Sequence, residues 1–80
     1  MYAPQPILEA LSVRPFRPFR LELSNGEMIT VTHPEQVWVF TSELLVARPG
    51  TNGDQRIYGG FSIIGLDHVV QLHRQQEASP

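Results

Sequence analysis

The sequence predicts a mainly β fold, in which a short N-terminal helix precedes a five- or six-stranded, strongly bent antiparallel sheet that forms a small barrel. The length of 80 residues fits one domain. Apolar residues have helical spacing before Pro15, and from Phe19 onwards short apolar stretches alternate with turn-forming residues. An open sheet of this size would leave two edges unpaired, whereas a barrel with the helix at one end buries more surface. We therefore expect one domain over residues 1–73 and a disordered tail over 74–80.

The N-terminal helix is expected to begin near Pro6, because proline suits the first helical position. Ile7, Leu8 and Leu11 follow with the spacing of one apolar stripe over about two turns. Pro15 ends the helix, since the residue before a proline avoids the helical conformation. A helix this short is marginal in isolation, so it should form only where its stripe packs on the sheet.

Strand spacing begins at Phe19, where apolar and polar residues alternate as far as Ser24. Asn25–Gly26 follows and is a strong hairpin signal, because both residues tolerate positive φ angles. A second strand is expected over Met28–His33, which is rich in β-branched residues. Pro34 ends that strand.

The second half of the chain predicts further short strands. Gly59–Gly60 indicates a bulge or a sharp bend, of the kind that a barrel corner needs. Residues 65–67 are interpreted as a tight turn, and the Pro-Gly-Thr-Asn-Gly-Asp stretch at 49–54 as a loop. The expected strands are Val37–Thr41, Leu44–Arg48, Arg56–Ile64 and Val69–His73.

Composition excludes several kinds of chemistry. The chain has eight acidic and six basic residues, for a net charge of −2 at pH 7, and every basic residue is arginine. Without lysine or cysteine it cannot use Schiff-base, thiol, disulfide or iron–sulfur chemistry. The chain has no basic stretch followed by an apolar run, which a signal peptide would have. Its longest apolar runs, such as residues 37–40, have four residues and are too short for a membrane span. We therefore expect a cytoplasmic protein with no cofactor.

A known family shares the pattern of Leu21, Leu23 and Asn25–Gly26 in the first hairpin, and of Val69 and Leu72 in the last strand. On these residues, and in the order of its elements, the chain resembles the Sm-like family, which includes the bacterial Hfq proteins. Members of that family are SH3-like barrels that form rings and bind RNA, so the resemblance implies a barrel and a tendency to assemble. The chain is also similar to small uncharacterised bacterial proteins with a Pro-Phe-x-Pro-Phe-Arg run.

The chain departs from the Sm-like pattern at several positions. Val31 stands where the family has a second glycine, five residues after the hairpin glycine. Residues 34–36 are Pro-Glu-Gln, where the family's RNA-contacting loop offers aspartate and asparagine. Leu66 and Asp67 align with the Lys–His pair of the Hfq type. No RNA-contacting residue is carried over, so the resemblance implies a fold and an assembly rather than a site.

The Arg-Pro-Phe-Arg-Pro-Phe-Arg run, called the arginine segment below, is the most unusual stretch of the chain. Its prolines favour polyproline II, whose three-residue period places Arg14, Arg17 and Arg20 on one face. Phe16 and Phe19 then fall on another face. One interpretation is a site for a nucleic acid or an acidic partner, with Arg14, Phe16, Arg17 and Arg20 as the binding residues. The other is that the two aromatic rings close the core while the arginines stay in solvent.

Two constellations of reactive residue types are interpreted as structural. His33, His68 and His73 match no zinc-ligand spacing, and we expect them to bond the backbone in turns. Ser62, Asp67 and His68 are the residue types of a nucleophilic triad, but the adjacent Asp67 and His68 would point in different directions. The surrounding sequence also lacks the nucleophile-elbow pattern. We therefore predict neither a metal site nor an enzyme.

Several strands carry neighbouring apolar residues, which alternation places on opposite faces of the sheet. If Trp38 points inward, Val37 and Val39 point outward. In the pairs Ile63–Ile64 and Val69–Val70, one residue likewise points outward. Either self-association or the N-terminal helix must cover such an outer face. The sequence therefore predicts a non-enzymatic β-barrel interaction module that self-associates or docks on a protein partner. The alternative is a Sm-like oligomeric RNA-binding protein that uses the arginine segment.

Overall fold

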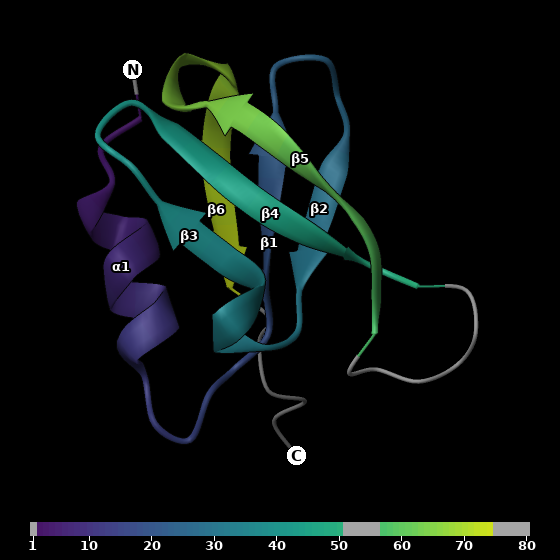
Figure 1. The fold of residues 1–80 in the computed structure, drawn as a ribbon. Helices are drawn as coiled ribbons and strands as arrows, with labels where there is room; N and C mark the ends of the chain where they lie inside the picture. The colour runs from purple at the N-terminus through teal and green to yellow at the C-terminus, as the bar shows by residue number, and fades with distance from the viewer. Residues whose placement is uncertain (1, 51–56, 75–80) are drawn as a thin grey trace.

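The computed structural model describes residues 2–50 and 57–74 and confirms a mainly β chain with a short N-terminal helix (Figure 1). Two single 3₁₀ turns, η1 and η2, interrupt the order of the strands. The elements are α1 (Gln5–Ser12), β1 (Phe19–Leu23), β2 (Met28–Val31), η1 (Pro34–Gln36), β3 (Val37–Val39), β4 (Glu43–Pro49), β5 (Tyr58–Gly65), η2 (Leu66–His68) and β6 (Val69–Arg74).

The strands form two antiparallel sheets of three, in the orders β2–β1–β6 and β3–β4–β5. In Figure 1 the sheet β3–β4–β5 crosses over the sheet β2–β1–β6, and α1 lies at the side of both. No ladder joins the two sheets within the described residues, so the single bent sheet that the sequence predicts is divided into two. The division has a local cause, because Pro34 opens η1 and the chain changes sheets there instead of bending as one strand.

The helix α1 forms where the sequence predicts it, although one residue of the predicted apolar stripe is exposed instead of buried. Ile7 and Ala10 are buried, and Leu11 packs against the core. Leu8, which the sequence also assigns to the apolar stripe, is 45% exposed. Ile7 and Ala10 are three positions apart, so they lie on one side of the helix and dock it against the core.

The hairpin of β1 and β2 follows the sequence prediction. Gly26 has a φ of 88°, which glycine adopts without strain. Asn25 stabilises the turn by accepting a hydrogen bond from the Glu27 N–H at Oδ1, at 2.9 Å. The second strand ends at Val31, two residues before the expected end at His33.

The ladder of β4 and β5 contains the predicted bulge. Its register shifts between Arg48 and Pro49, so that Gly59 on β5 has no partner on β4. A Cβ atom on Gly59 would lie 3.2 Å from the Gly50 Cα, so the close approach of the two strands favours glycine there. Most of the expected loop, and the first residue of the expected fifth strand, fall within residues 51–56 and lie outside the described residues.

The last strand is tied to the rest of the chain through η2. The expected tight turn is this 3₁₀ turn, whose Leu66 N–H donates to the Ser42 carbonyl at 2.8 Å. The Leu66 carbonyl in turn accepts from the Tyr2 N–H at 3.1 Å. β6 pairs with β1 as far as Arg74, which therefore belongs to the strand and not to the expected tail. Residues 75–80 lie outside the described residues.

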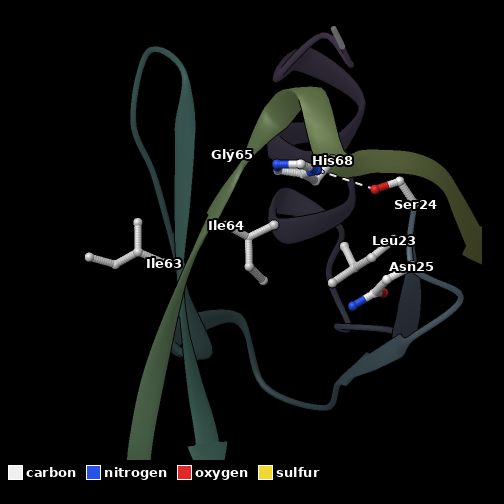
Figure 2. A pocket seen from close by; sticks show the side chains of 7 residues that line it. All are labelled: Leu23, Ser24, Asn25, Ile63, Ile64, Gly65 and His68. Carbon is white, nitrogen blue, oxygen red and sulfur yellow. Dashed lines mark hydrogen bonds between the residues drawn. The ribbon is translucent and has the colours of Figure 1, made fainter.

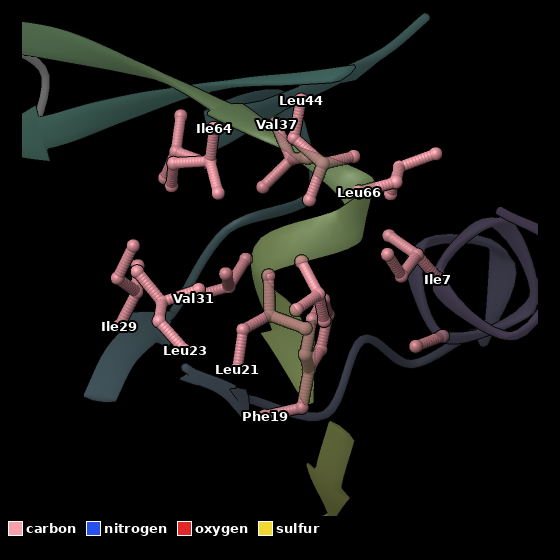
Figure 3. Close-up of a cluster of buried hydrophobic side chains, with 13 residues drawn as sticks. Ile7, Phe19, Leu21, Leu23, Ile29, Val31, Val37, Leu44, Ile64 and Leu66 are labelled. Atoms are coloured by element: carbon pink, nitrogen blue, oxygen red, sulfur yellow. The ribbon is translucent and has the colours of Figure 1, made fainter. Parts of the chain in front are cut away.

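One hydrophobic core lies between the two sheets (Figure 3). Both sheets contribute residues to it: burial alternates along β1, and Leu44 and Val46 of β4 belong to the core. Ile7 of α1 approaches the cluster from the side, next to Leu66. Its fully buried apolar side chains are Phe19, Ile7, Leu21, Leu44, Leu66, Val31 and Val46.

Gln36 is a buried polar side chain that joins the two sheets. It is 1% exposed, and its Oε1 accepts hydrogen bonds from the Thr32 N–H at 3.0 Å and the Thr32 hydroxyl at 3.2 Å. Its Nε2 donates to the Thr30 carbonyl at 3.3 Å and to the Ala47 carbonyl at 3.0 Å. Thr30 belongs to β2 and Ala47 to β4, so this one amide fixes the position of one sheet against the other.

Candidate functional site

The outer face of the sheet β2–β1–β6 is mostly polar, although Met28, which pairs with Glu22, is a 39% exposed apolar side chain on it. Because the apolar residues of β1 are buried, Arg20 and Glu22 between them point outward, next to Thr30 and His73 on the neighbouring strands. His73 Nε2 lies 2.8 Å from Glu22 Oε1, which joins β6 to β1 across this face. Such a surface is suited to contact with water.

The outer face of the sheet β3–β4–β5 is apolar. Trp38 on β3 is opposite Leu45 on β4, which is opposite Ile63 on β5, so one row of large side chains crosses all three strands. Phe61 occupies the next outward position of β5, opposite Ala47. Trp38 is 52% exposed, and Phe61 and Ile63 are each 63% exposed. We call Trp38, Leu45, Phe61 and Ile63 the apolar face.

The prediction that apolar side chains lie on both faces is confirmed, with Trp38 on the outer face and Val37 on the inner one. Val37 is 7% exposed and belongs to the core. Valine fits a thin core between two sheets better than the much larger indole. On β5, Ile64 is 8% exposed and its neighbour Ile63 points to the opposite side of the strand (Figure 2).

The alternative that the N-terminal helix covers the outer face is wrong. The buried residues of α1, Ile7 and Ala10, belong to the cluster between the sheets. Helix α1 therefore closes one side of the core, and it leaves Trp38 and Ile63 more than half exposed. In the described part of the chain, Trp38, Phe61 and Ile63 of the apolar face are therefore open to solvent, and Leu45 between them is partly exposed.

A pocket of about 350 Å³ lies between the C-terminal part of β5 and the turn of the first hairpin. In Figure 2, Ile64 and Leu23 point toward each other across this space. His68 Nδ1 and Ser24 Oγ lie 3.2 Å apart and close one end. The lining residues are Leu23, Ser24, Asn25, Ile63, Ile64, Gly65 and His68.

A smaller pocket of about 220 Å³ lies at the other end of β5, where Tyr58 and Pro49 face His33. Gln36 also lines it, but the amide atoms of Gln36 already bond Thr32 and the backbone. Neither pocket contains a buried polar side-chain atom that lacks a hydrogen bond among the described residues.

The three histidines lie apart, in the bend before η1, in η2 and in β6, and each contacts a different side chain. His33 Nδ1 lies 3.0 Å from the Thr32 hydroxyl, whereas His68 contacts Ser24 and His73 contacts Glu22. These partners are side chains, not the backbone groups expected from the sequence. Within residues 2–50 and 57–74, no three histidine, aspartate or glutamate side chains come together as a metal site.

The residue types of the nucleophilic triad are engaged elsewhere. Ser62 Oγ accepts a hydrogen bond from Arg48 Nε at 2.7 Å, and His68 contacts Ser24. Arg48 also places Nη2 3.3 Å from Glu27 Oε2, so it links the ladder of β4 and β5 to the first hairpin. Ser62 thus has a structural partner in place of a catalytic base.

The arginine segment leaves α1 and enters β1. Arg14 Nη1 donates to the carbonyls of Leu11 and Val13, each at 2.9 Å, and so satisfies acceptors at the end of α1. Phe16 packs against the core and Phe19 is buried in it, with their ring centroids 6.1 Å apart.

The three arginines of this segment are exposed. Arg20 is the second residue of β1, on the polar outer face. The binding roles of Arg14, Phe16, Arg17 and Arg20 stay predictions.

Sequence reasoning missed Gln36 and Arg48, which are polar side chains that connect the sheets. For Gln36 the available signal is its position, directly before an apolar strand and after a proline that turns the chain. For Arg48 no signal exists in the sequence, because Glu27 is brought near it by the crossing of the sheets alone.

No family model, curated protein or solved structure matches the chain. The one helix in the described residues, α1, has neither the length nor the apolar character needed to span a bilayer. The Sm-like resemblance and the cytoplasmic location stay predictions from the sequence.

Proposed function

We propose that this protein is a non-enzymatic interaction module, a small SH3-like barrel of the Sm-like kind that self-associates or docks on a protein partner. The observation that carries the proposal is the contrast between its two outer faces. Both sheets bury one side in the same core, yet one presents Arg20, Glu22 and His73 outward and the other presents Trp38 and Ile63.

Contacts between the two sheets support the barrel description. Gln36 bonds both sheets, and the Ser24 N–H donates to the His68 carbonyl at 2.8 Å, which ties the first hairpin to η2. Leu66 connects the same turn to Ser42, between β3 and β4. Two sheets that share one core and are linked at both ends act as one rigid body, which can present a surface to a partner.

The size of the apolar face supports a role in binding. The exposed parts of Trp38, Phe61 and Ile63 together amount to roughly 350 Å², from typical side-chain areas. Patches of about 300–600 Å² are the largest on ordinary monomers and are often functional. Covering this area would be favourable by about 9 kcal/mol. The translational and rotational freedom lost on association costs about 4–15 kcal/mol, which is of the same order. A few additional contacts would therefore make the complex stable.

The first test is the absolute mass in solution, by light scattering behind a sizing column at two salt concentrations and a range of protein concentrations. We expect a mass above one chain that falls on dilution and does not fall with added salt, since apolar burial is not screened. The single tryptophan, Trp38, lies in the apolar face, so a blue shift of its emission on association would show that the contact covers this part of the face.

Two variants make the test specific. The double variant Trp38→Ser, Phe61→Ser should lose association, whereas Met28→Ser, which removes a 39% exposed apolar side chain from the other sheet, should keep it. If the protein is a monomer at every concentration, docking on a protein partner is the remaining form of the proposal. In a binding assay the wild type would then capture that partner and the double variant would not. If the variant and the wild type behave alike in both assays, the proposal fails.

RNA binding by the arginine segment is the second hypothesis. The observation in its favour is that Arg14, Arg17 and Arg20 are all exposed within one short stretch. It predicts binding of single-stranded RNA that weakens steeply with salt, with a slope of about −0.7 per phosphate contact. The triple alanine variant should lose this binding, and Arg74→Ala should retain it. Binding retained by the triple variant would rule out the arginine segment as the RNA-binding site. A ring-sized mass in solution would support the Sm-like assembly.

A further inference from the structure

We propose that a second copy of this chain pairs edge to edge with β5, antiparallel and two-fold symmetric about Ser62. The inference rests on the proposed function, and it names the partner and the register of the contact. The result would be a continuous six-stranded sheet in which Phe61 and Ile63 of each copy meet across the new contact, while Trp38 on β3, two strands from the edge, stays exposed.

β5 is an edge strand without the usual protection. Edge strands in soluble proteins are blunted by shortness, charge or proline, because their unpaired backbone groups invite another strand. The edge strands β2 and β3 have four and three residues, and β6 ends in His73 and Arg74. β5 has eight residues, Tyr58–Gly65, with no charge and no proline. Phe61 and Ile63 on this strand are the most exposed large apolar side chains of the described residues.

The backbone groups of Phe61 and Ile63 point away from β4. The Leu66 N–H bonds the Ser42 carbonyl, in line with the register that pairs Leu44 with Ile64. Hydrogen-bonded and non-hydrogen-bonded pairs alternate along an antiparallel ladder, so the pairs that bond β4 to β5 involve the even-numbered residues of β5. The N–H and C=O groups of Phe61 and Ile63 therefore face the free edge of the sheet.

The Ser62-centred register is the most self-complementary arrangement. It places Phe61 opposite Ile63 of the partner subunit, and Ile63 opposite Phe61 of the partner subunit, so that two aromatic–β-branched pairs form. Both pairs lie on the outer face, and their backbones exchange hydrogen bonds across the two-fold axis. A shift of two residues in one direction places Ile63 opposite Gly59 of the partner subunit, and a shift in the other direction places Phe61 opposite Gly65 of the partner subunit. Either shift leaves one large apolar pair in place of two.

The same register also fits the space beside β5. Toward its C-terminal end, β5 passes the turn of the first hairpin, where the pocket of about 350 Å³ leaves room at Ile64 and Gly65. In this register the residues facing these two positions are Gly60 of the partner subunit and Gly59 of the partner subunit. A stretch without side chains therefore passes the point where Ser24 and Asn25 come nearest to the edge.

A cross-link tests the register directly, because the chain contains no cysteine. Ser62 would face Ser62 of the partner subunit in a non-hydrogen-bonded pair, with a Cα separation of about 4.5 Å, which a disulfide spans. Under mild oxidation Ser62→Cys should form a disulfide-linked dimer at least tenfold faster than Thr30→Cys, an exposed position on the edge strand β2. A register shifted by two residues separates the cysteines by about 7–8 Å and prevents the bond.

A proline variant tests edge pairing without a cross-link. Because the Ile63 N–H faces the free edge, Ile63→Pro removes an intermolecular donor and keeps the ladder with β4. We expect a monomer by light scattering with an unchanged far-UV circular dichroism spectrum. Should Ile63→Pro fail to fold, the cross-linking rate of Ser62→Cys decides the question, with Ser62→Ala showing whether loss of the Arg48 contact alone perturbs the fold.

The outcomes separate this inference from the proposed function. A wild-type dimer, a fast Ser62→Cys cross-link and a monomeric Ile63→Pro support edge pairing. A wild-type dimer with slow Ser62→Cys cross-linking and a dimeric Ile63→Pro overturns edge pairing and leaves self-association through another contact. A wild-type monomer at millimolar concentration that does not cross-link also overturns it, and the proposed function then depends on a different protein partner.

Discussion

Replacing Gln36 by leucine should show how much the amide that joins the two sheets contributes to the free energy of unfolding. Leucine has a similar volume and keeps the site apolar and filled. It removes the acceptor used by the Thr32 N–H and the donors used by the Thr30 and Ala47 carbonyls. The substitution therefore changes hydrogen bonding and leaves packing nearly constant.

The expected loss of stability follows from the burial of these three groups. The hydrogen bond to the Ala47 carbonyl is buried, so its loss costs about 1–3 kcal/mol. The hydrogen bonds to Thr30 and Thr32 are partly buried, so the loss of each costs about 0.5–1.5 kcal/mol. Burial of the leucine side chain offsets about 1–2 kcal/mol. The midpoints of these ranges give a net loss of about 2.5 kcal/mol, or a decrease in Tm of about 10–20 °C for a chain of this size. A domain of this length is stable by about 4–12 kcal/mol, so the variant should still fold at 25 °C.

Urea unfolding, followed by circular dichroism and by the emission of Trp38, measures this loss. A lower midpoint with an unchanged m-value indicates a change in stability alone. The matched control is Gln71→Leu, the same substitution at an exposed position of β6, which should change stability by less than about 0.5 kcal/mol. If Gln36→Leu costs no more than Gln71→Leu, the bonds of Gln36 do not hold the sheets together and the reasoning is wrong.

Three further predictions concern the elements around the core. Ile7→Ala should cost about 2–4 kcal/mol in urea unfolding, because Ile7 is fully buried, whereas the 45% exposed Leu8→Ala should cost under about 0.5 kcal/mol; equal losses would mean that α1 does not dock through Ile7. Gly26→Ala should cost about 1 kcal/mol in thermal unfolding because φ is 88°, and Gly26→Asn should cost less; the reverse order would contradict the hairpin geometry. Arg48→Ala should cost about 1 kcal/mol through its bond to Ser62, whereas Glu27→Gln, which removes an exposed ion pair, should cost under about 0.5 kcal/mol; a larger effect at Glu27 would reverse the assignment.

The elements of the fold could be predicted because their signals are local. The alternation that begins at Phe19 specifies a strand, the Asn25–Gly26 pair specifies a turn, and the glycines at 59–60 specify a bulge. Each signal comes from residues that are close together in the sequence. The division into two sheets was not predicted. It depends on how Pro34 turns the chain and on how Gln36 then bonds Ala47, eleven residues away.

The candidate site was predicted in part. Neighbouring apolar residues required two apolar faces, and this inference came from the alternation of strands alone. The direction of Trp38 did not follow, because hydropathy favours burying the indole and cannot weigh its volume against a thin core. The polar character of the other outer face, with His73 beside Glu22, depends on pairing between residues 51 positions apart and has no local signal.

Folding alone does not explain why so many aromatic side chains lie outside the core. The chain has seven aromatic residues, and Trp38, Phe40 and Phe61 are each more than half exposed. In a chain of 80 residues apolar burial is the main source of stability, so large side chains left in solvent contribute little to folding while they promote association. The double variant Trp38→Ser, Phe61→Ser removes the buried parts of both rings, about half of Trp38 and a third of Phe61, and should lose about 2–4 kcal/mol of unfolding free energy. It should still fold at 25 °C while its association is lost, because the exposed parts of these rings contribute to binding and not to folding.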